Sequence, residues 1–271
     1  MQPILRLEHV TCRYPGENTP ALRDCSLSIH RGEKIAVLGR NGAGKSTFFL
    51  LLNGVIRPEH GWIQFGEKEI RKEADLSILR RGTGLVFQDP DVQILAGNVE
   101  EEVAFGPANL GLSRDEIGRA VDKAIAALHL EEYRRRAPQY LSGGEKKRVT
   151  IADVLAIDPA VMLLDEPASS LDPAGRRNLE EHLENLHRSG MALLVATHDL
   201  DFAWRWAERI LVFEAGTLAA DGTPEEIFSD QPLLERCALE KPVLYQVGEL
   251  LGIAPPRTIE QLRQLTGTKQ I

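Results

Sequence analysis

Cysteine is scarce in this sequence of 271 residues, and its three cysteines, Cys12, Cys25 and Cys237, lie far apart. Neither a C-x-x-C pair nor a dense cluster is present, which excludes a disulfide framework and a thiolate metal site. We therefore expect three ordinary thiols in a reducing compartment.

Long apolar runs are also missing. The longest stretches without a charged residue, 46–56 and 103–113, are eleven residues each, whereas a helix needs about 20 apolar residues to span a bilayer. The first ten residues lack the basic start and the long apolar stretch of a secretory signal. We expect no transmembrane helix and a cytoplasmic location, so that any role at a membrane depends on partner proteins.

The sequence has no excess of positive charge either. Forty acidic residues against 32 basic ones give a net charge of −8. A protein that binds nucleic acid through its phosphate backbone usually carries a basic surface. Nucleic acid is therefore not an expected partner.

Short apolar runs recur along the chain and alternate with segments of helical spacing. Runs of this length are typical of buried strands, and their alternation with helices predicts an α/β fold with a parallel sheet. The runs lie at residues 4–10, 25–29, 34–38, 85–87, 161–164, 192–196 and 210–213.

Two parts of the chain depart from this alternation. Between residues 89 and 140 no strand is expected, and residues 115–130 have the apolar spacing of an amphipathic helix. After Gly216 the sequence predicts short helices separated by Pro or Gly, at 224–228, 242–251 and 258–265.

Two details of these last helices can be predicted. Thr258 and Gln261 have the spacing of a capping box. An apolar stripe most often packs on the parent domain, and such a stripe is formed by Val243, Leu244, Val247, Leu250 and Leu251.

Residues 39–47 read G-R-N-G-A-G-K-S-T and match the phosphate-binding pattern G-x-x-x-x-G-K-[ST]. In this pattern backbone N–H groups surround the phosphates, Lys45 reaches the outer phosphates and Ser46 binds Mg²⁺. A strand at 34–38 precedes the loop and a helix at 46–52 follows it. This context favours a nucleotide site over an ordinary glycine-rich turn.

Two adjacent carboxylates, Asp165 and Glu166, follow the apolar run at 161–164. By itself, an Asp-Glu pair is more often a solvated turn. Together with a phosphate loop in the same chain, the pair predicts that Asp165 holds Mg²⁺ and that Glu166 polarises the attacking water as general base.

A second anion site is predicted where Leu141-Ser142-Gly143-Gly144-Glu145 introduces a helix at 145–157. Ser142 is the expected N-cap, and Glu145 is its capping-box partner three residues on. A glycine-rich helix start leaves N–H groups free, and the helix dipole favours negative charge there. Taken alone, the same residues are also an ordinary helix start.

These motifs stand in the order found in ABC transporter ATPases, and residues 4–230 resemble that family. The resemblance rests on Gly39–Thr47, Gln88, Leu141–Gly144, Leu164–Glu166, Ser170–Asp172 and His198. It implies an α/β P-loop NTPase fold: a RecA-like core with an N-terminal antiparallel β region, a helical insert subdomain and a small helical C-terminal extension. The implied boundaries are 1–88 and 141–222 for the core, 89–140 for the helical subdomain and 223–271 for the extension.

In that family two subunits dimerise head to tail, and the signature of one closes on the γ-phosphate held by the other. Carried over, Glu166, His198 and Gln88 are catalytic, Ser46, Gln88 and Asp165 hold Mg²⁺, and Asp172 links the two sites. The residues implied to bind ATP are Tyr14, Gly39, Asn41, Gly42, Ala43, Gly44, Lys45, Ser46, Thr47, Ser142, Gly143, Gly144 and Asp172. Taken alone, Tyr14 could be common packing and His198 a strand-end histidine with a local hydrogen bond.

Residues 86–112 resemble, within this family, the ATPases of energy-coupling factor transporters, in particular the cobalt branch. The matching segments are V-F-Q-D-P-D-V-Q-I-L and V-E-E-E-V-A-F-G-P-A-N-L-G-L. The resemblance implies cobalt import, with nickel or vitamin import as the alternative. As an alternative, the second segment contains an acidic helix at 99–105 that only caps the helical insert.

The same resemblance implies partners and a location. We expect a second ATPase subunit in a homodimer, held in part by the C-terminal extension, and integral membrane proteins that form the scaffold and bind the substrate. The subunit would then be peripheral, at the cytoplasmic face of the plasma (inner) membrane.

A soluble ABC ATPase that acts on DNA or ribosomes is a further alternative, and so is a nucleotide-binding regulator without turnover. The first is disfavoured because only 97 positions separate Lys45 from Ser142 and no sustained heptads lie between them. The presence of Glu166 and His198 speaks against the second.

Overall fold

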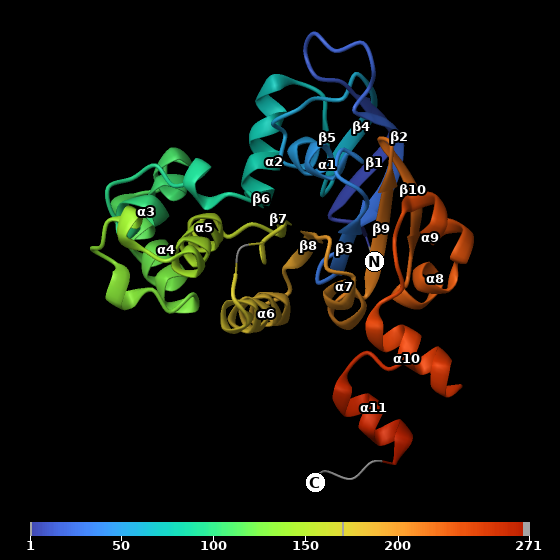
Figure 1. Ribbon diagram of the computed structural model, residues 1–271. Coiled ribbons are helices and arrows are strands. Elements are labelled where there is room, and N and C mark those ends of the chain that lie inside the picture. The colour runs from blue at the N-terminus through green and yellow to red at the C-terminus, as the bar shows by residue number, and fades with distance from the viewer. Residues whose placement is uncertain (1, 170, 268–271) are drawn as a thin grey trace.

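The predicted α/β core is present in the computed structural model, which describes residues 2–169 and 171–267. A six-stranded sheet has the strand order β10-β9-β3-β8-β7-β6 (Figure 1). Adjacent strands are parallel except β10, which is antiparallel to β9. The strands are β3 (Lys34–Leu38), β6 (Thr83–Val86), β7 (Val161–Asp165), β8 (Ala192–Ala196), β9 (Arg209–Glu214) and β10 (Thr217–Gly222).

A second, antiparallel sheet of four strands has the order β2-β1-β4-β5. It contains β1 (Leu5–Cys12), β2 (Leu22–Ile29), β4 (His60–Phe65) and β5 (Lys68–Ile70). The apolar runs predicted the first two strands but not β4 and β5. Of the six residues of β4 only Ile63 is buried, so this short strand has no continuous apolar run.

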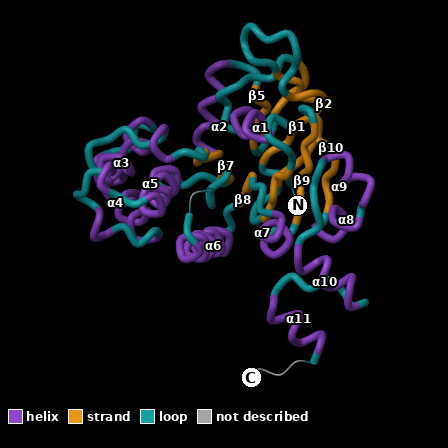
Figure 2. Tube along the Cα trace, in the orientation of Figure 1, coloured by secondary structure: helices purple, strands orange, loops and turns teal. Residues whose placement is uncertain are grey.

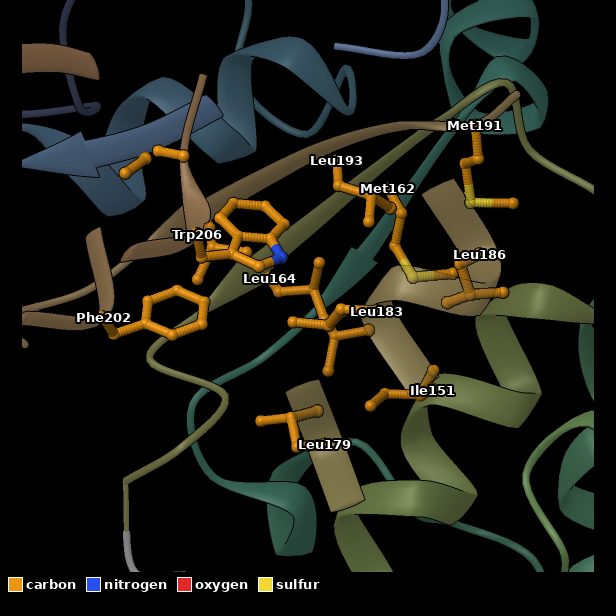
Figure 3. Close-up of a cluster of buried hydrophobic side chains, with 14 of the residues drawn as sticks. Ile151, Met162, Leu164, Leu179, Leu183, Leu186, Met191, Leu193, Phe202 and Trp206 are labelled. Atoms are coloured by element: carbon orange, nitrogen blue, oxygen red, sulfur yellow. The ribbon is translucent and has the colours of Figure 1, made fainter. Parts of the chain in front are cut away.

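The parallel strands are buried on both faces, which is why their sequences are continuous apolar runs. Successive side chains of a strand point to opposite faces of the sheet. On β7, Met162 and Leu164 belong to one core cluster, and Val161 and Leu163 belong to the other. Figure 3 shows the first cluster, in which Met162 and Leu164 lie near Leu183 of α6 (Pro173–Arg188).

The other face of the sheet is covered by α1 (Lys45–Leu52), as its apolar sequence predicts. Phe48 and Phe49 are fully buried, and the ring of Phe48 lies 4.9 Å from that of Phe213 on β9. The helix packs in the same cluster as residues of β1 and β2. It therefore joins the two sheets and fixes the residue at its start, Lys45, relative to both.

Residues 87–160, all of which the structure describes, contain helices and loops but no strand. Figures 1 and 2 show α3, α4 and α5 as a helical group beside the six-stranded sheet. The predicted helix at 115–130 is α4, and the one at 145–157 is α5. The elements of this part are η2 (Pro90–Val92), α3 (Val99–Asn109), α4 (Arg114–Ala127), η3 (Glu131–Tyr133), η4 (Pro138–Tyr140) and α5 (Gly143–Leu155).

The remaining helices flank the core or follow it. They are η1 (Glu73–Asp75), α2 (Leu76–Gly82), α7 (Leu200–Trp206), α8 (Pro224–Ser229), α9 (Gln231–Cys237), α10 (Val243–Leu251) and α11 (Ile259–Thr266). The sequence did not predict α9, whose Leu233 and Leu234 are buried in the core. Among the described residues, no helix is long and apolar enough to cross a bilayer. Cys12, Cys25 and Cys237 are free thiols, and all three are buried.

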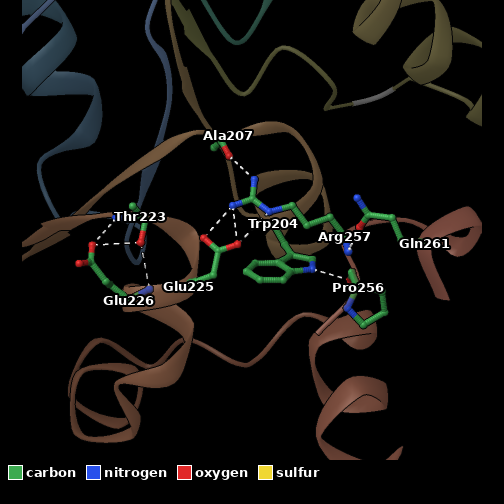
Figure 4. A network of polar contacts seen from close by, with 8 residues as sticks. All are labelled: Trp204, Ala207, Thr223, Glu225, Glu226, Pro256, Arg257 and Gln261. Atoms are coloured by element: carbon green, nitrogen blue, oxygen red, sulfur yellow. Dashed lines mark hydrogen bonds and ion pairs between the residues drawn. The ribbon is translucent and has the colours of Figure 1, made fainter. Parts of the chain in front are cut away.

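The segment between α10 and α11 is tied to α7 by the polar network of Figure 4. The indole N–H of Trp204 donates to the carbonyl oxygen of Pro256 over 2.8 Å. The guanidinium of Arg257 lies 5.1 Å above the Trp204 ring and donates to the carbonyl oxygen of Ala207 and to the Glu225 carboxylate. The second half of α7 and the residue that follows it are thus linked to the segment that joins α10 and α11.

Of the two predictions for this region, the capping box was wrong and the packing of the apolar stripe held only in part. Thr258 caps α11 by accepting from the Gln261 N–H, but the Gln261 side chain accepts from the Arg257 N–H instead of closing the capping box. On α10 the buried residues are Tyr245 and Gly248, because Tyr245 packs against the Trp204 ring. Of the stripe expected to pack, Leu244 packs against the core and Val247 is partly buried, whereas Val243, Leu250 and Leu251 are exposed.

The cluster of Figure 3 makes a testable contribution to stability. Leu183 is completely buried, so Leu183→Ala leaves a cavity and should lower the free energy of unfolding by about 2–5 kcal/mol. Leu95→Ala, at a site that is 76% exposed, is the matched control and should change it little. Urea unfolding followed by circular dichroism measures both, and equal midpoints for the two variants would contradict the assigned core.

Candidate nucleotide-binding site

Four neighbouring strands bring the predicted catalytic residues to one edge of the sheet. In the order β6-β7-β8-β3, Gln88 lies just after β6, Glu166 directly after β7, His198 just after β8 and Gly39 directly after β3. Because these strands are parallel, their carboxyl ends meet at the same edge. Ligands of open α/β sheets bind at that edge.

The phosphate loop requires glycine at two positions. Gly39 has a φ of 142°, and a Cβ there would lie 2.3 Å from the carbonyl oxygen of Phe213. Gly44 has a φ of 108°, and its Cβ would lie 3.0 Å from Leu22. Both the positive φ and the close approach exclude a side chain, so the loop conformation follows from the glycines that define the motif.

The loop curls around its lysine. The Lys45 ammonium donates to the carbonyl oxygens of Gly39, over 2.6 Å, and Arg40, over 3.3 Å. Burial lowers the pKa of Lys45, and the carboxylates of Glu166 and Asp165 oppose this shift. The loop therefore keeps a cation at its centre, as binding of phosphate requires.

A cavity of about 450 Å³ lies over this loop. Besides predicted residues it is lined by Ala21 and Arg40, which the sequence analysis did not single out, whereas Gly39 and Ala43 do not line it. Most of the predicted residues do line it: Tyr14, Asn41, Gly42, Gly44, Lys45, Ser46, Thr47, Gln88, Asp165, Glu166 and His198.

The predicted metal ligands fit a magnesium ion. The Ser46 hydroxyl donates to Asp165 Oδ2 over 2.6 Å, so oxygens from two distant motifs meet at one point. Gln88 lines the same cavity and can add an amide oxygen. Hydroxyl, carboxylate and amide oxygens are the donors that Mg²⁺ accepts.

Glu166 has a free acceptor at the centre of the site. Its Oε1 is buried and lacks a hydrogen-bond partner among the described residues, although His198 Nε2 lies 3.2 Å away. Burial raises the pKa of Glu166, with Lys45 opposing. Burial, reinforced by Lys45, lowers the pKa of His198. A basic carboxylate oxygen that accepts no hydrogen bond from the described residues and lies beside an imidazole is suited to take a proton from water.

Tyr14 lies at the rim of the cavity. Its hydroxyl is 3.0 Å from Thr47 Oγ1, and the residue is 38% exposed. The hydrogen bond places the phenol near the start of α1, which leaves part of the ring surface open. Contact of that ring with adenine stays a prediction.

The signature residues lie in a separate cavity of about 400 Å³, lined by Ser142, Gly143, Gly144 and Asp172. The predicted capping box is confirmed: Ser142 Oγ accepts from the Glu145 N–H, and Glu145 accepts from the Ser142 N–H. Asp172 caps α6 by accepting from the Gly175 N–H over 2.7 Å. Ser170, the first residue of the Ser-Leu-Asp motif, lies outside the described residues.

A buried lysine, Lys147 on α5, was not found from the sequence. It is 2% exposed and donates to the carbonyl oxygens of Phe87, over 3.0 Å, and Gln88, over 2.7 Å. Burial lowers its pKa to about 8. Its helical position was a usable signal, because Lys147 shares a face with the apolar positions Ile151 and Val154.

Comparisons with known proteins agree with this geometry. A family model described as ABC transporter matches residues 22–169. The energy-coupling factor transporter ATP-binding protein EcfA2 of Methanospirillum hungatei is 46% identical over 96% of this chain and 66% of its own length. EcfA of Methanothermobacter thermautotrophicus is 43% identical over 88% of this chain and 77% of its own length.

Solved structures show the same similarity. The structure of cbiO1 from Clostridium perfringens, described as part of the ABC transporter complex cbiONQ, has 36% identity and a TM-score of 0.77, covering 93% of this chain and all of the other. An ATP-binding cassette in a dimeric post-hydrolysis state with ADP and Pi has 27% identity and a TM-score of 0.72 over 81% and 98% of the two chains. The chain therefore belongs to the ABC transporter family, as an ATP-hydrolysing subunit similar to those of energy-coupling factor transporters.

Proposed function

We propose that this chain binds MgATP between two of its copies, hydrolyses it, and thereby drives cobalt import by an energy-coupling factor complex. The observation that carries the dimeric site is the separation of the two anion sites. The phosphate loop and the signature line different cavities of one chain, so an ATP molecule held by the loop needs a second chain to supply a signature. The dimeric cassette of similar structure supports this arrangement.

Hydrolysis would rest on the residues at the sheet edge. Lys45 and the loop backbone hold the phosphates, while Ser46, Asp165 and Gln88 hold Mg²⁺, which neutralises charge on the phosphates when bound. Glu166 accepts the proton of the attacking water through its free Oε1. His198, kept neutral by its lowered pKa, donates to the γ-phosphate. The signature residues and Asp172 act on the partner's nucleotide.

Three parts of the chain have separate roles in this proposal. Residues 1–88 and 141–222 would form the ATPase core, 89–140 the helical subdomain and 223–271 the extension. Exposed apolar side chains at Val92, Leu95 and Phe105 lie in the segment that resembles energy-coupling ATPases. They suit a groove that receives helices of a membrane scaffold protein, with the subunit peripheral at the cytoplasmic face of the plasma membrane.

Cobalt is proposed over nickel or a vitamin on the resemblance of residues 86–112 to the cobalt branch. Similarity to cbiO1 of the cbiONQ complex supports the same choice. The ATPase does not contact the substrate, so the test must include the membrane partners. Purification of the tagged chain from native membranes, with mass spectrometry of the partners and metal analysis, should give integral membrane proteins and cobalt. Nickel or a vitamin in the same complex would contradict cobalt as the substrate. Absence of integral membrane proteins would contradict the proposed role in transport.

Glu166→Gln should abolish ATP turnover and leave ATP binding intact, because the amide keeps the shape of the carboxylate but cannot accept the proton. Phosphate release and binding of a fluorescent ATP analogue measure the two properties. Glu67→Gln, an exposed glutamate remote from the cavity in sequence, is the control and should retain both. A wild-type rate of ATP hydrolysis in Glu166→Gln would contradict the assignment of Glu166 as the general base.

The C-terminal extension should contribute to the dimer through its exposed apolar residues. Leu250 is 86% exposed and Leu265 is 49% exposed. Their combined replacement, Leu250→Glu with Leu265→Glu, places charges in the proposed contact and should weaken self-association by about tenfold or more. Analytical ultracentrifugation measures the dissociation constant.

The matched control for that experiment is Gln246→Glu with Gln264→Glu, which adds the same charges at neighbouring polar positions. Point substitutions are preferable to deletion of residues 231–271, because Leu233 and Leu234 of α9 are part of the core. An unchanged dissociation constant for the leucine variant would show that the extension does not hold the dimer.

A further inference from the structure

Lys147 holds the backbone of the catalytic glutamine. Its ammonium donates to the carbonyl oxygens of two consecutive residues, Phe87 and Gln88, at the point where the chain leaves β6. Within the described part of the chain, Lys147 forms no ion pair with a carboxylate. Burying an ammonium group without hydrogen-bond partners costs free energy. The carbonyl oxygens of Phe87 and Gln88 are therefore held next to the Lys147 ammonium.

Other contacts tie the following residues to the same helix. Lys146 of α5 pairs with Asp91 over 2.6 Å. The amide of Gln93 donates to the Thr150 carbonyl and to Asp153, also on α5, and its oxygen accepts from the Phe87 N–H. The segment 87–93 is therefore attached along the length of α5, and a displacement of that helix will carry the segment with it.

The same helix begins at the signature. Ser142 is the N-cap of α5, and Lys147 lies in its second turn, so about 6 Å of continuous helix separates Gly143 from Lys147. A helix of this length transmits a displacement of its first turn to its second. Whatever Ser142, Gly143 and Gly144 bind is thereby linked to the backbone of Gln88, which lines the other cavity.

We propose that Lys147 is a positioning residue for Gln88, and that it couples the nucleotide gripped by a subunit's signature to the glutamine in that subunit's own catalytic cavity. When the signature closes on the partner's ATP, α5 moves and Lys147 draws the carbonyls of 87 and 88 with it. Gln88 then reaches the metal and the water. The two ATP sites of the dimer are thus coupled through the Lys147 ammonium of each chain. This inference rests on the proposed function, in particular on the role of Gln88.

The test compares Lys147→Met with Lys146→Met in the full-length chain. Methionine keeps the length of the side chain but removes the charge and the donors. Lys147→Met should keep ATP affinity within about twofold and lower kcat by about tenfold or more, because two hydrogen bonds from a charged group are lost. It should also raise the Mg²⁺ concentration for half-maximal rate and reduce the cooperativity in ATP. Lys146→Met removes only the ion pair with Asp91. Its ATP affinity, kcat, Mg²⁺ requirement and cooperativity should each stay within about twofold of the wild-type values.

A double-mutant cycle with Gln88→Ala separates positioning from a merely structural role. If Lys147 acts through Gln88, the double variant should be no slower than Gln88→Ala alone. Multiplicative losses in kcat would overturn the inference and leave the proposed function intact. A normal rate and Mg²⁺ dependence for Gln88→Ala itself would instead overturn the proposed role of Gln88.

Folding is checked by thermal unfolding and by binding of the ATP analogue. If Lys147→Met does not fold, Lys147→Gln takes its place, since it keeps one donor pair without the charge. Lys147→Arg, which keeps charge and donors, should recover cooperativity relative to either neutral variant. Neutral variants with wild-type kcat and cooperativity would refute the proposal.

Discussion

The parallel pairing of β3, β8, β7 and β6 is the constraint on which the site depends. It aligns the carboxyl ends of four strands whose sequences lie far apart. The phosphate loop, Asp165, Glu166 and His198 then meet because they lie at the ends of these strands or within two residues of them. Burial of the strands on both faces, by α1 on one side and α6 on the other, holds this edge rigid.

Electrostatics at that edge follow from the same burial. Burial lowers the pKa of Lys45 and raises the pKa of Glu166, so it favours the neutral form of both groups. The charge of each group opposes the pKa shift of the other. Burial and the charge of Lys45 lower the pKa of His198, with Asp165 opposing, and the net shift favours the neutral imidazole. The site therefore keeps a basic oxygen, a cation and a neutral donor within one small cavity, the combination that proton transfer beside a phosphate requires.

The helices outside the sheet act as connections between sites. α5 carries the signature at its start and holds the Gln88 backbone in its second turn. α7 follows His198 directly, and its other contacts reach the C-terminal helices: the Val243 N–H donates to Asp201, and Trp204 donates to Pro256. Two of the predicted catalytic residues are thus linked to exposed parts of the chain, Gln88 through α5 to the signature and His198 through α7 to the C-terminal helices.

Local patterns in the sequence were sufficient for the strands buried on both faces, the helices with clear apolar spacing and the phosphate loop, because neighbouring residues determine these. The capping box of Ser142 and Glu145 was predictable for the same reason. Three further points depended on the tertiary structure. The strand β4 has a single buried residue, α10 turns Tyr245 and not its leucines toward Trp204, and Lys147 finds its carbonyl partners 59 and 60 positions away. These depend on which surfaces meet after folding, and no local period encodes that.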